Sequence, residues 1–108
     1  MNEQLSIAQA DLEIAVEAVR DVLRNPGLVP PAEGASLDRM LVHMTNMREA
    51  IASSPDRHAN VAKRLNDFAM TTNRMQNKHP GAAPDLARLS DALLAASQRL
   101  QGSPAGAG

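Results

Sequence analysis

The sequence predicts an all-α protein, built as a four-helix bundle. Alanine and leucine dominate its apolar residues, whereas aromatic residues make up only 1% of the chain. Strands favour β-branched and aromatic side chains, so a sheet is disfavoured. Proline and glycine fall in four clusters, and between them apolar residues recur every three or four positions, as in amphipathic helices. A length of 108 residues fits one domain. Helical hairpins that complete a bundle by oligomerisation remain an alternative.

The first helix is predicted over residues 3–24. Its main apolar seam follows an unbroken three-four spacing and consists of Leu5, Ala8, Leu12, Ala15, Val19 and Val22. A further apolar row, Ile7, Ile14, Val16 and Leu23, widens this stripe beyond a single seam. We therefore expect this helix to have neighbours on more than one side. Pro26 and Gly27 end it.

The second helix is predicted over 36–53, after a linker rich in proline and glycine. Ser36 is a suitable N-cap, and Asp38 in the first turn favours the positive helix end. Its inner face includes a methionine row at i, i+4 and i+7, formed by Met40, Met44 and Met47.

The third helix is predicted over 55–78, with Ser54 as its N-cap and Pro55 in its first turn. Its apolar seam consists of Val61, Leu65, Phe68, Thr72 and Met75. Almost no linker separates the second and third helices, so we expect them to form a tight antiparallel hairpin.

The fourth helix is predicted over 84–101, with Pro84 and Asp85 at its start. Its seam again follows the three-four spacing, with Leu86, Leu89, Leu93, Ala96 and Leu100. Residues 1–101 thus form a single helical domain. Residues 102–108 contain only Gly, Ser, Pro and Ala and have no large apolar side chain to bury, so we expect a disordered tail.

The composition excludes several function classes. The chain has no Cys, and therefore no disulfide, thiolate nucleophile or cysteine zinc site. A formal charge of −1 removes the usual electrostatic basis for binding nucleic acid or acidic membranes. With no Tyr or Trp, there is no platform for stacking a base or flavin. We expect no cofactor and no membrane partner. Without a basic leader or a long apolar run, the expected address is cytoplasmic, with leaderless export left open.

A histidine phosphotransfer protein is one alternative for a helical bundle of this size. Such domains expose a mid-helix His followed by Lys three residues on and Gly four residues on. Here His58 is followed at those positions by Val61 and Ala62, and His43 by Asn46 and Met47, so neither matches. A solvated histidine near a turn is the simpler interpretation of His58.

A soft-metal site is a second possibility, because His43 shares the face of the methionine row. Thioether and imidazole groups suit Cu(I), but methionine also fills gaps in bundle cores and adaptable interfaces. No Glu-x-x-His motif, phosphate loop, dinucleotide fingerprint or nucleophile elbow occurs. We therefore predict no metal site, no catalytic residue and no enzymatic activity.

Basic residues gather in the third helix, at Arg57, Lys63, Arg64, Arg74 and Lys78. A small DNA-binding regulator is the functional interpretation of this stripe. DNA binding would require more positive charge and groups that read bases. We expect a solvated face instead, with Asp67 interspersed, and no nucleic-acid partner.

The stretch from Ser36 to Lys78 resembles the subunits of type III secretion needles. The resemblance lies in the Ser54-Pro55-Asp56 turn and in Asn73-Arg74-Met75-Gln76 downstream. Those subunits are small helical hairpins around a Pro-Ser-Asp-Pro-like turn and are held by helical chaperones before export. The resemblance implies a component or chaperone of a bacterial secretion system. It covers well under half of the chain, which lacks the second turn proline and the usual tyrosine, so no functional residue is carried over.

The remaining function is binding by shape. We predict a non-enzymatic protein–protein interaction module, such as an adaptor, chaperone or assembly subunit, whose partner is another protein chain in a homodimer or a heterologous complex. The predicted anchors for this partner are the apolar row and the methionine row: Ile7, Ile14, Val16, Leu23, Met40, Met44 and Met47.

Overall fold

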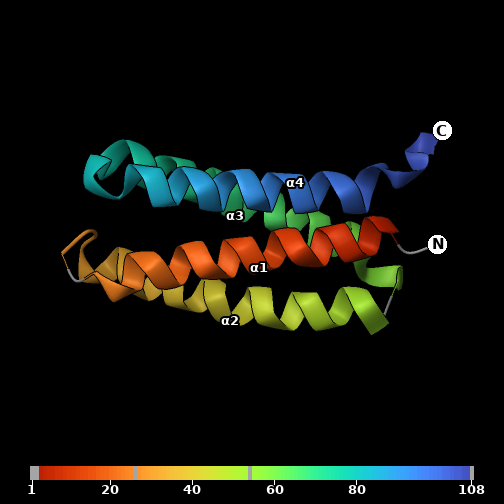
Figure 1. Ribbon diagram of the computed structural model, residues 1–108, viewed down its shortest axis with the longest axis horizontal. Coiled ribbons are helices and arrows are strands. Elements are labelled where there is room, and N and C mark those ends of the chain that lie inside the picture. Colours follow the sequence, from red (N-terminus) through yellow and green to blue (C-terminus); the bar gives the residue numbers. More distant parts are fainter. Residues whose placement is uncertain (1–2, 26, 54, 108) are drawn as a thin grey trace.

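A computed structural model describes residues 3–25, 27–53 and 55–107, with the side chains of 6–25, 27–53 and 56–101. The helices are α1 (Glu3–Arg24), α2 (Pro31–Ser53), α3 (His58–Lys78) and α4 (Ala83–Ala107), with 3₁₀ turns η1 (Pro55–Arg57) and η2 (Pro80–Ala82). The helices run along the long axis of the molecule (Figure 1). No strand occurs within the described ranges. The predicted all-α bundle is confirmed.

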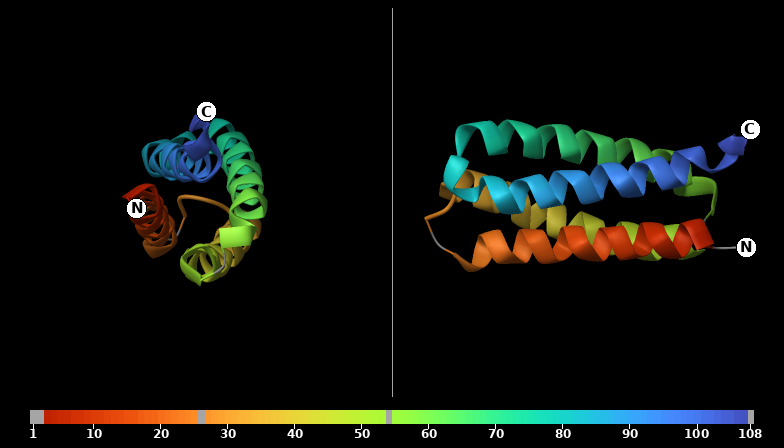
Figure 2. Two further views of the ribbon diagram at one scale, coloured as in Figure 1. Left: turned by 90° about the vertical axis from the view of Figure 1, so that its right-hand side faces the viewer. Right: turned by 45° about the horizontal axis from the view of Figure 1, so that its top comes forward.

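Helix α4 is the centre of the packing. It packs extensively on both α1 and α3, whereas α1 packs less on α2, and α2 and α3 make the least contact of these neighbouring pairs. Viewed end-on, the helices follow the order α1, α4, α3, α2 around the bundle (Figure 2). Helix α2 is therefore the least firmly held of the four.

Small side chains explain the close approach of α1 and α4. Ala8, Ala15 and Ala18 of α1 are fully buried, and α4 buries Ala96 fully and Ala92 almost fully. Interaxial distance falls with the size of the side chains at the contact. Larger apolar residues fill the rest of the core, and those that are fully buried are Leu12, Val19, Val22, Leu37, Met44, Ile51, Leu65, Leu86, Leu89 and Leu93.

Buried hydroxyl groups join α4 to α3. The Ser97 hydroxyl donates to the Ala62 carbonyl at 2.8 Å, and the Ser90 hydroxyl donates to Asn73 Oδ1 at 3.0 Å. Within α3, the Thr72 hydroxyl donates to the Phe68 carbonyl. No buried side-chain N or O atom of the described part lacks a hydrogen-bond partner. These small polar residues therefore occupy the core without an unsatisfied group.

Helix α2 begins at Pro31, five residues before the predicted start, and Ser36 lies inside it rather than capping it. Proline suits the first helical position because its missing N–H has no partner there. The Pro30 carbonyl accepts a bond from Gly34 N at 2.9 Å, which fixes the first turn. The prediction placed Gly34 in the linker before residue 36, but an isolated glycine inside a helix costs only about 1 kcal/mol relative to alanine.

Helix α3 also differs from its prediction. Residues 55–57 form the 3₁₀ turn η1, so the α-helix starts at His58, and the predicted N-cap Ser54 lies outside the described residues. The short connection predicted between α2 and α3 is present, but the close packing expected of a tight hairpin is not, because the two helices make little contact beyond that connection.

Helix α4 begins at Ala83, after η2, and extends to Ala107, beyond the predicted end at 101. The predicted end at residue 101 rested only on Gly102, because glycine often ends a helix. The side chains of 102–107 and all of Gly108 lie outside the described part. Disorder of 102–108 remains a prediction.

Candidate functional site

A hollow lies between α2 and α3, the neighbouring helices that make the least contact. It has a volume of about 790 Å³ and is open to solvent. We call it the α2–α3 groove. Its lining residues are His43, Asn46, Met47 and Ala50 of α2, with Arg57, Asn60, Val61, Lys63, Arg64 and Asp67 of η1 and α3.

The floor of the α2–α3 groove is apolar. Met47 and Val61 are each 7% exposed, and Ala50 is half-buried. At the side of the groove, the rings of His43 and Phe68 lie 6.0 Å apart at a tilt of 41°. An unbranched thioether next to small residues can repack around an inserted side chain. The floor is therefore suited to an apolar anchor.

The rim of the α2–α3 groove is basic. Arg57, Lys63 and Arg64 line it, and Asp67 is the only acid among its lining residues. None of these three cations forms an ion pair with a described side chain. Helix α2 contributes no acid to this lining. The groove therefore has an excess of positive charge in a chain whose formal charge is −1.

All three histidines lie along the α2–α3 seam. His58 Nε2 donates to the Ile51 carbonyl of α2 at 2.9 Å, which requires the proton on Nε2. At the other end of α2, His79 Nε2 donates to Glu33 Oε2 at 3.2 Å. His43 lies midway, against Phe68. Hydrogen bonds thus attach both ends of α2 to the ends of α3, along a seam where these two helices make few contacts.

The structure buries the predicted methionine anchors inside the chain. Met44 is fully buried, and Met40 and Met47 are 5% and 7% exposed. They join the same core as the leucines of α1 and α4. The methionine row is therefore bundle core, and only Met47 borders an open hollow.

The apolar row predicted on the first helix divides between two flanks of α1. Ile7 and Ile14 are 37% and 47% exposed, and Ile14 lines a shallow hollow of about 480 Å³ against α4. Val16, predicted outside the core, belongs to it and is 9% exposed. Leu23 is half-buried and approaches Gly34 of α2. The four side chains therefore lie on different sides of α1 and do not all face one partner.

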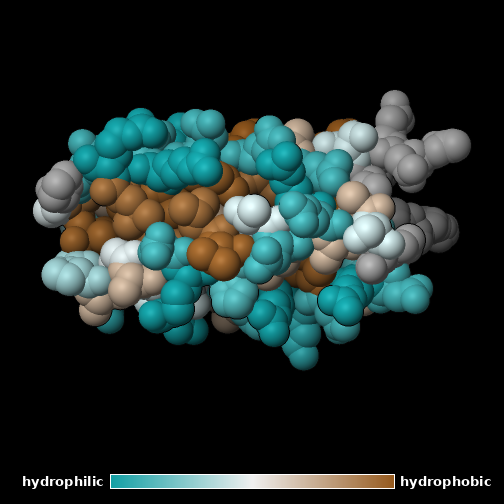
Figure 3. Space-filling model, turned by 90° about the horizontal axis from the view of Figure 1, so that it is seen from below, coloured by the Kyte–Doolittle hydropathy of each residue, from teal (hydrophilic) through white to brown (hydrophobic). Residues whose placement is uncertain are grey.

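A second apolar surface lies where the connection from α1 meets α2. Figure 3 shows apolar side chains gathered in a band toward that end of the bundle, between hydrophilic margins. A hollow of about 590 Å³ there is lined by Val22, Leu23, Leu28, Val29, Pro30 and Pro31, among others. Gly27 adopts a φ of +97°, which favours glycine in the turn. This surface carries little charge.

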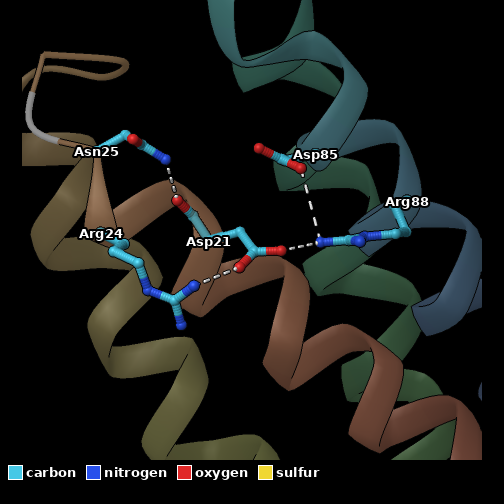
Figure 4. A network of polar contacts seen from close by, with 5 residues as sticks. All are labelled: Asp21, Arg24, Asn25, Asp85 and Arg88. Carbon is cyan, nitrogen blue, oxygen red and sulfur yellow. Dashed lines mark hydrogen bonds and ion pairs between the residues drawn. The ribbon is translucent and has the colours of Figure 1, made fainter.

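Two carboxylates, those of Asp21 and Asp85, lie close together because both contact Arg88 (Figure 4). Arg88 donates to Asp21 Oδ2 at 2.5 Å and lies 3.6 Å from Asp85 Oδ1. The hydrogen bond to Asp21 raises the pKa of the Arg88 guanidinium above its ordinary value. Arg24 also donates to Asp21, at 3.1 Å. The network clamps α1 to α4 and leaves neither carboxylate without a cation.

Nothing else in the described part gathers catalytic or metal-ligating groups. No three of its His, Asp and Glu side chains lie close enough to hold a metal ion. None of its helices combines the length and the apolar character that crossing a bilayer requires.

Sequence reasoning recognised the basic residues of the third helix but interpreted them as a solvated face. The missing information was the position of α2, which turns one edge of that face into a groove. The sequence contained a signal for the position of these cations. Arg57, Arg64 and Lys78 occur at multiples of seven residues, with Thr71 at the remaining position of the series. That spacing places them on the flank of Val61 and Phe68, next to the apolar seam.

Comparisons with known proteins give no match. No family model matches the sequence, and neither a curated protein nor a solved structure is significantly similar to it.

Proposed function

We propose that this chain is a non-enzymatic binding module that receives a segment of another polypeptide in the α2–α3 groove. The observation that carries the proposal is the groove itself, about 790 Å³ with an apolar floor and a polar rim. Concave sites with such a floor and a few polar groups are typical of binding surfaces. Adaptors, chaperones and assembly subunits use surfaces of this kind, and a cytoplasmic address is part of the proposal.

The loose attachment of α2 supports this function. A helix with fewer close contacts to its neighbours can shift more readily than the others to admit a partner side chain. The buried methionines on its inner face can adjust their rotamers as it moves. Beside α4, the described residues form a smaller and shallower hollow, of about 480 Å³ next to Ile14.

Site-directed photo-crosslinking tests the proposal. A benzophenone amino acid replaces Asn46 at the groove or, as a control, exposed Asn66 on the opposite flank of α3. Irradiation in extract of the native cells is expected to give a discrete protein adduct from position 46 only. The captured chain, once identified and purified, must then bind the unlabelled protein with a defined stoichiometry.

A matched pair of variants locates the binding. Ala50→Trp fills the groove, whereas Ala59→Trp adds the same bulk at an exposed position that does not line it. Circular dichroism checks that both variants stay helical. Binding of the captured chain should be lost in Ala50→Trp and retained in Ala59→Trp. Equal binding by the two folded variants would contradict a groove-based function.

A further inference from the structure

Three cations of the chain, Arg57, Lys63 and Arg64, lie together at the α2–α3 groove. Outside the groove, Arg24, Arg48, Arg88 and Arg99 each form an ion pair with Asp or Glu, whereas Arg20, Arg39, Arg74 and Lys78 form none with a described side chain. At the groove, Asp67 is the one acid among the lining residues, and it forms no ion pair with Arg57, Lys63 or Arg64. Positive charge is therefore concentrated and left without a partner at the place where the apolar floor is accessible.

The same polarity extends along the whole α2–α3 seam. Beyond the His43–Phe68 contact lies a smaller hollow of about 310 Å³, which Arg74 and Lys78 line together with Glu33. Glu33 is already engaged by His79. The basic side of α3 thus borders the opening at both ends, and the two hollows follow the helix axes.

These observations identify the kind of partner, given the proposed function on which they rest. We infer that the occupant of the α2–α3 groove is an acidic amphipathic helix of a partner protein. Its apolar side chains insert over Met47, Ala50 and Val61, and its Glu or Asp side chains pair with Arg57 and Arg64. Arginine can hold a carboxylate with two parallel hydrogen bonds, which adds geometric selectivity to the charge.

A helix fits the shape of the opening. The lining residues of the groove span 43–50 of α2 and 57–67 of η1 and α3, about two to three helical turns, so the groove is an open trough along the helix axes rather than a closed cavity. Helices that dock in such troughs insert side chains at i, i+3 or i+4 and i+7. Acids that flank this row would lie on the side of α3, where the cations are. A docked helix would also pack against the sides of α2 and α3 that face each other and make little contact.

A nucleic acid fits less well. The cations surround an apolar floor instead of a broad flat face, and Asp67 lies among them. Phe68 is the only aromatic residue of the chain and is half-buried against His43. No other aromatic residue is present for bases to stack on. Short DNA therefore serves as a competing probe in the test.

The test uses the full chain and designed probes in fluorescence anisotropy. The first probe is a fluorescent amphipathic peptide of roughly 16 residues, about 24 Å long as a helix, with a leucine face flanked by glutamates. The second probe carries lysine in place of every glutamate. The third is a fluorescent single-stranded DNA of similar length. The acidic peptide is expected to bind at least about tenfold more tightly than either of the other two.

Charge-matched variants assign the effect to the groove. Arg64→Glu and Arg20→Glu change the net charge equally, and both positions are exposed, but only Arg64 lines the groove. Arg64→Glu should weaken binding of the acidic peptide by about tenfold or more, whereas Arg20→Glu should change it by less than about twofold. Raising the salt concentration from about 0.05 to about 0.3 M should weaken binding to the unchanged protein.

The outcomes separate this inference from the proposed function. Failure of the acidic peptide to bind at about 1 mM, equal binding of its lysine twin, or equal losses in the two charge variants would overturn the acidic-helix inference. Tighter binding of DNA would overturn it in favour of a nucleic-acid partner. The crosslinking and the Ala50→Trp test would remain valid in each case, because they do not depend on the charge of the occupant.

Discussion

The two sides of α3 are built on different principles. Toward α4 it meets alanine, leucine and hydroxyl groups, with Ser90 and Ser97 joined to it by hydrogen bonds. Toward α2 it presents arginine, lysine, Val61 and the Phe68 ring, and contact is sparse. The first side provides stability through close packing. The second borders the α2–α3 groove, so under the proposed function stability and binding belong to opposite faces of one helix.

The largest expected difference between the two seams comes from truncating a core side chain in each. Leu93 in α4 is fully buried, so Leu93→Ala should lower the free energy of unfolding by about 3 kcal/mol. Met47→Ala removes a side chain that borders the open groove, where the structure can relax, and should cost about half as much. Urea denaturation measures both. Equal losses would mean that the α2–α3 seam is packed as tightly as the α3–α4 seam.

A second comparison uses the two flanks of α1. Val16→Asp puts a carboxylate against the core next to α2 and should destabilise the fold by about 2 kcal/mol or more. Ile14→Asp replaces an exposed side chain and should change stability by less than about 0.5 kcal/mol. Thermal unfolding followed by circular dichroism gives both values. Light scattering on the same samples tests whether Ile14 holds copies of the chain together, which would appear as a lower mass in Ile14→Asp.

The buried hydroxyl bond of the α3–α4 seam should have a smaller effect. Ser97→Ala removes the donor to the Ala62 carbonyl and should cost about 1 kcal/mol. Ser53→Ala is the control, because its hydroxyl bonds to the Glu49 carbonyl within the same helix at an exposed position. Chemical denaturation should show almost no change for the control. A loss as large in Ser53→Ala would show that the α3–α4 hydrogen bond has no special role.

The smallest expected effect concerns the clamp between α1 and α4. Asp21→Asn weakens the contacts with Arg24 and Arg88 and should cost less than about 1 kcal/mol, because the groups are partly exposed. The loss should shrink further as salt is added. Asp91→Asn changes the charge equally at an exposed residue without an ion pair among the described side chains. Urea denaturation at two ionic strengths measures the free energy of unfolding of both variants. An equal loss with the same salt dependence in the two variants would contradict the clamp.

Periodicity predicted the four helices well because apolar spacing depends only on each segment. The bounds of α1 match the predicted 3–24, and Leu12, Leu65 and Leu93 lie in the core as the seams required. Helix ends were less predictable. The start of α2 depended on whether Pro31 or Ser36 opens the helix, and a local pattern can support either.

The groove could not be predicted, because it depends on how far apart two helices lie. The sequence of a single helix does not show which of its apolar residues are buried in the bundle and which are exposed. Val16 and Met44 therefore seemed as available to a partner as Ile14. Their burial is decided by α2 and by the rest of the bundle. The cations of α3 were visible in the sequence, but their lack of acidic partners is a property of the whole fold.

The adjacency of α1 and α4 has a consequence for synthesis on the ribosome. The best-packed contacts of the chain join its first helix to its last, and α3 also rests on that last helix. Contacts between residues so far apart in sequence form late, since the intervening chain must first be ordered. A nascent chain that lacks α4 therefore exposes the apolar faces of α1 and α3 until α4 has been synthesised.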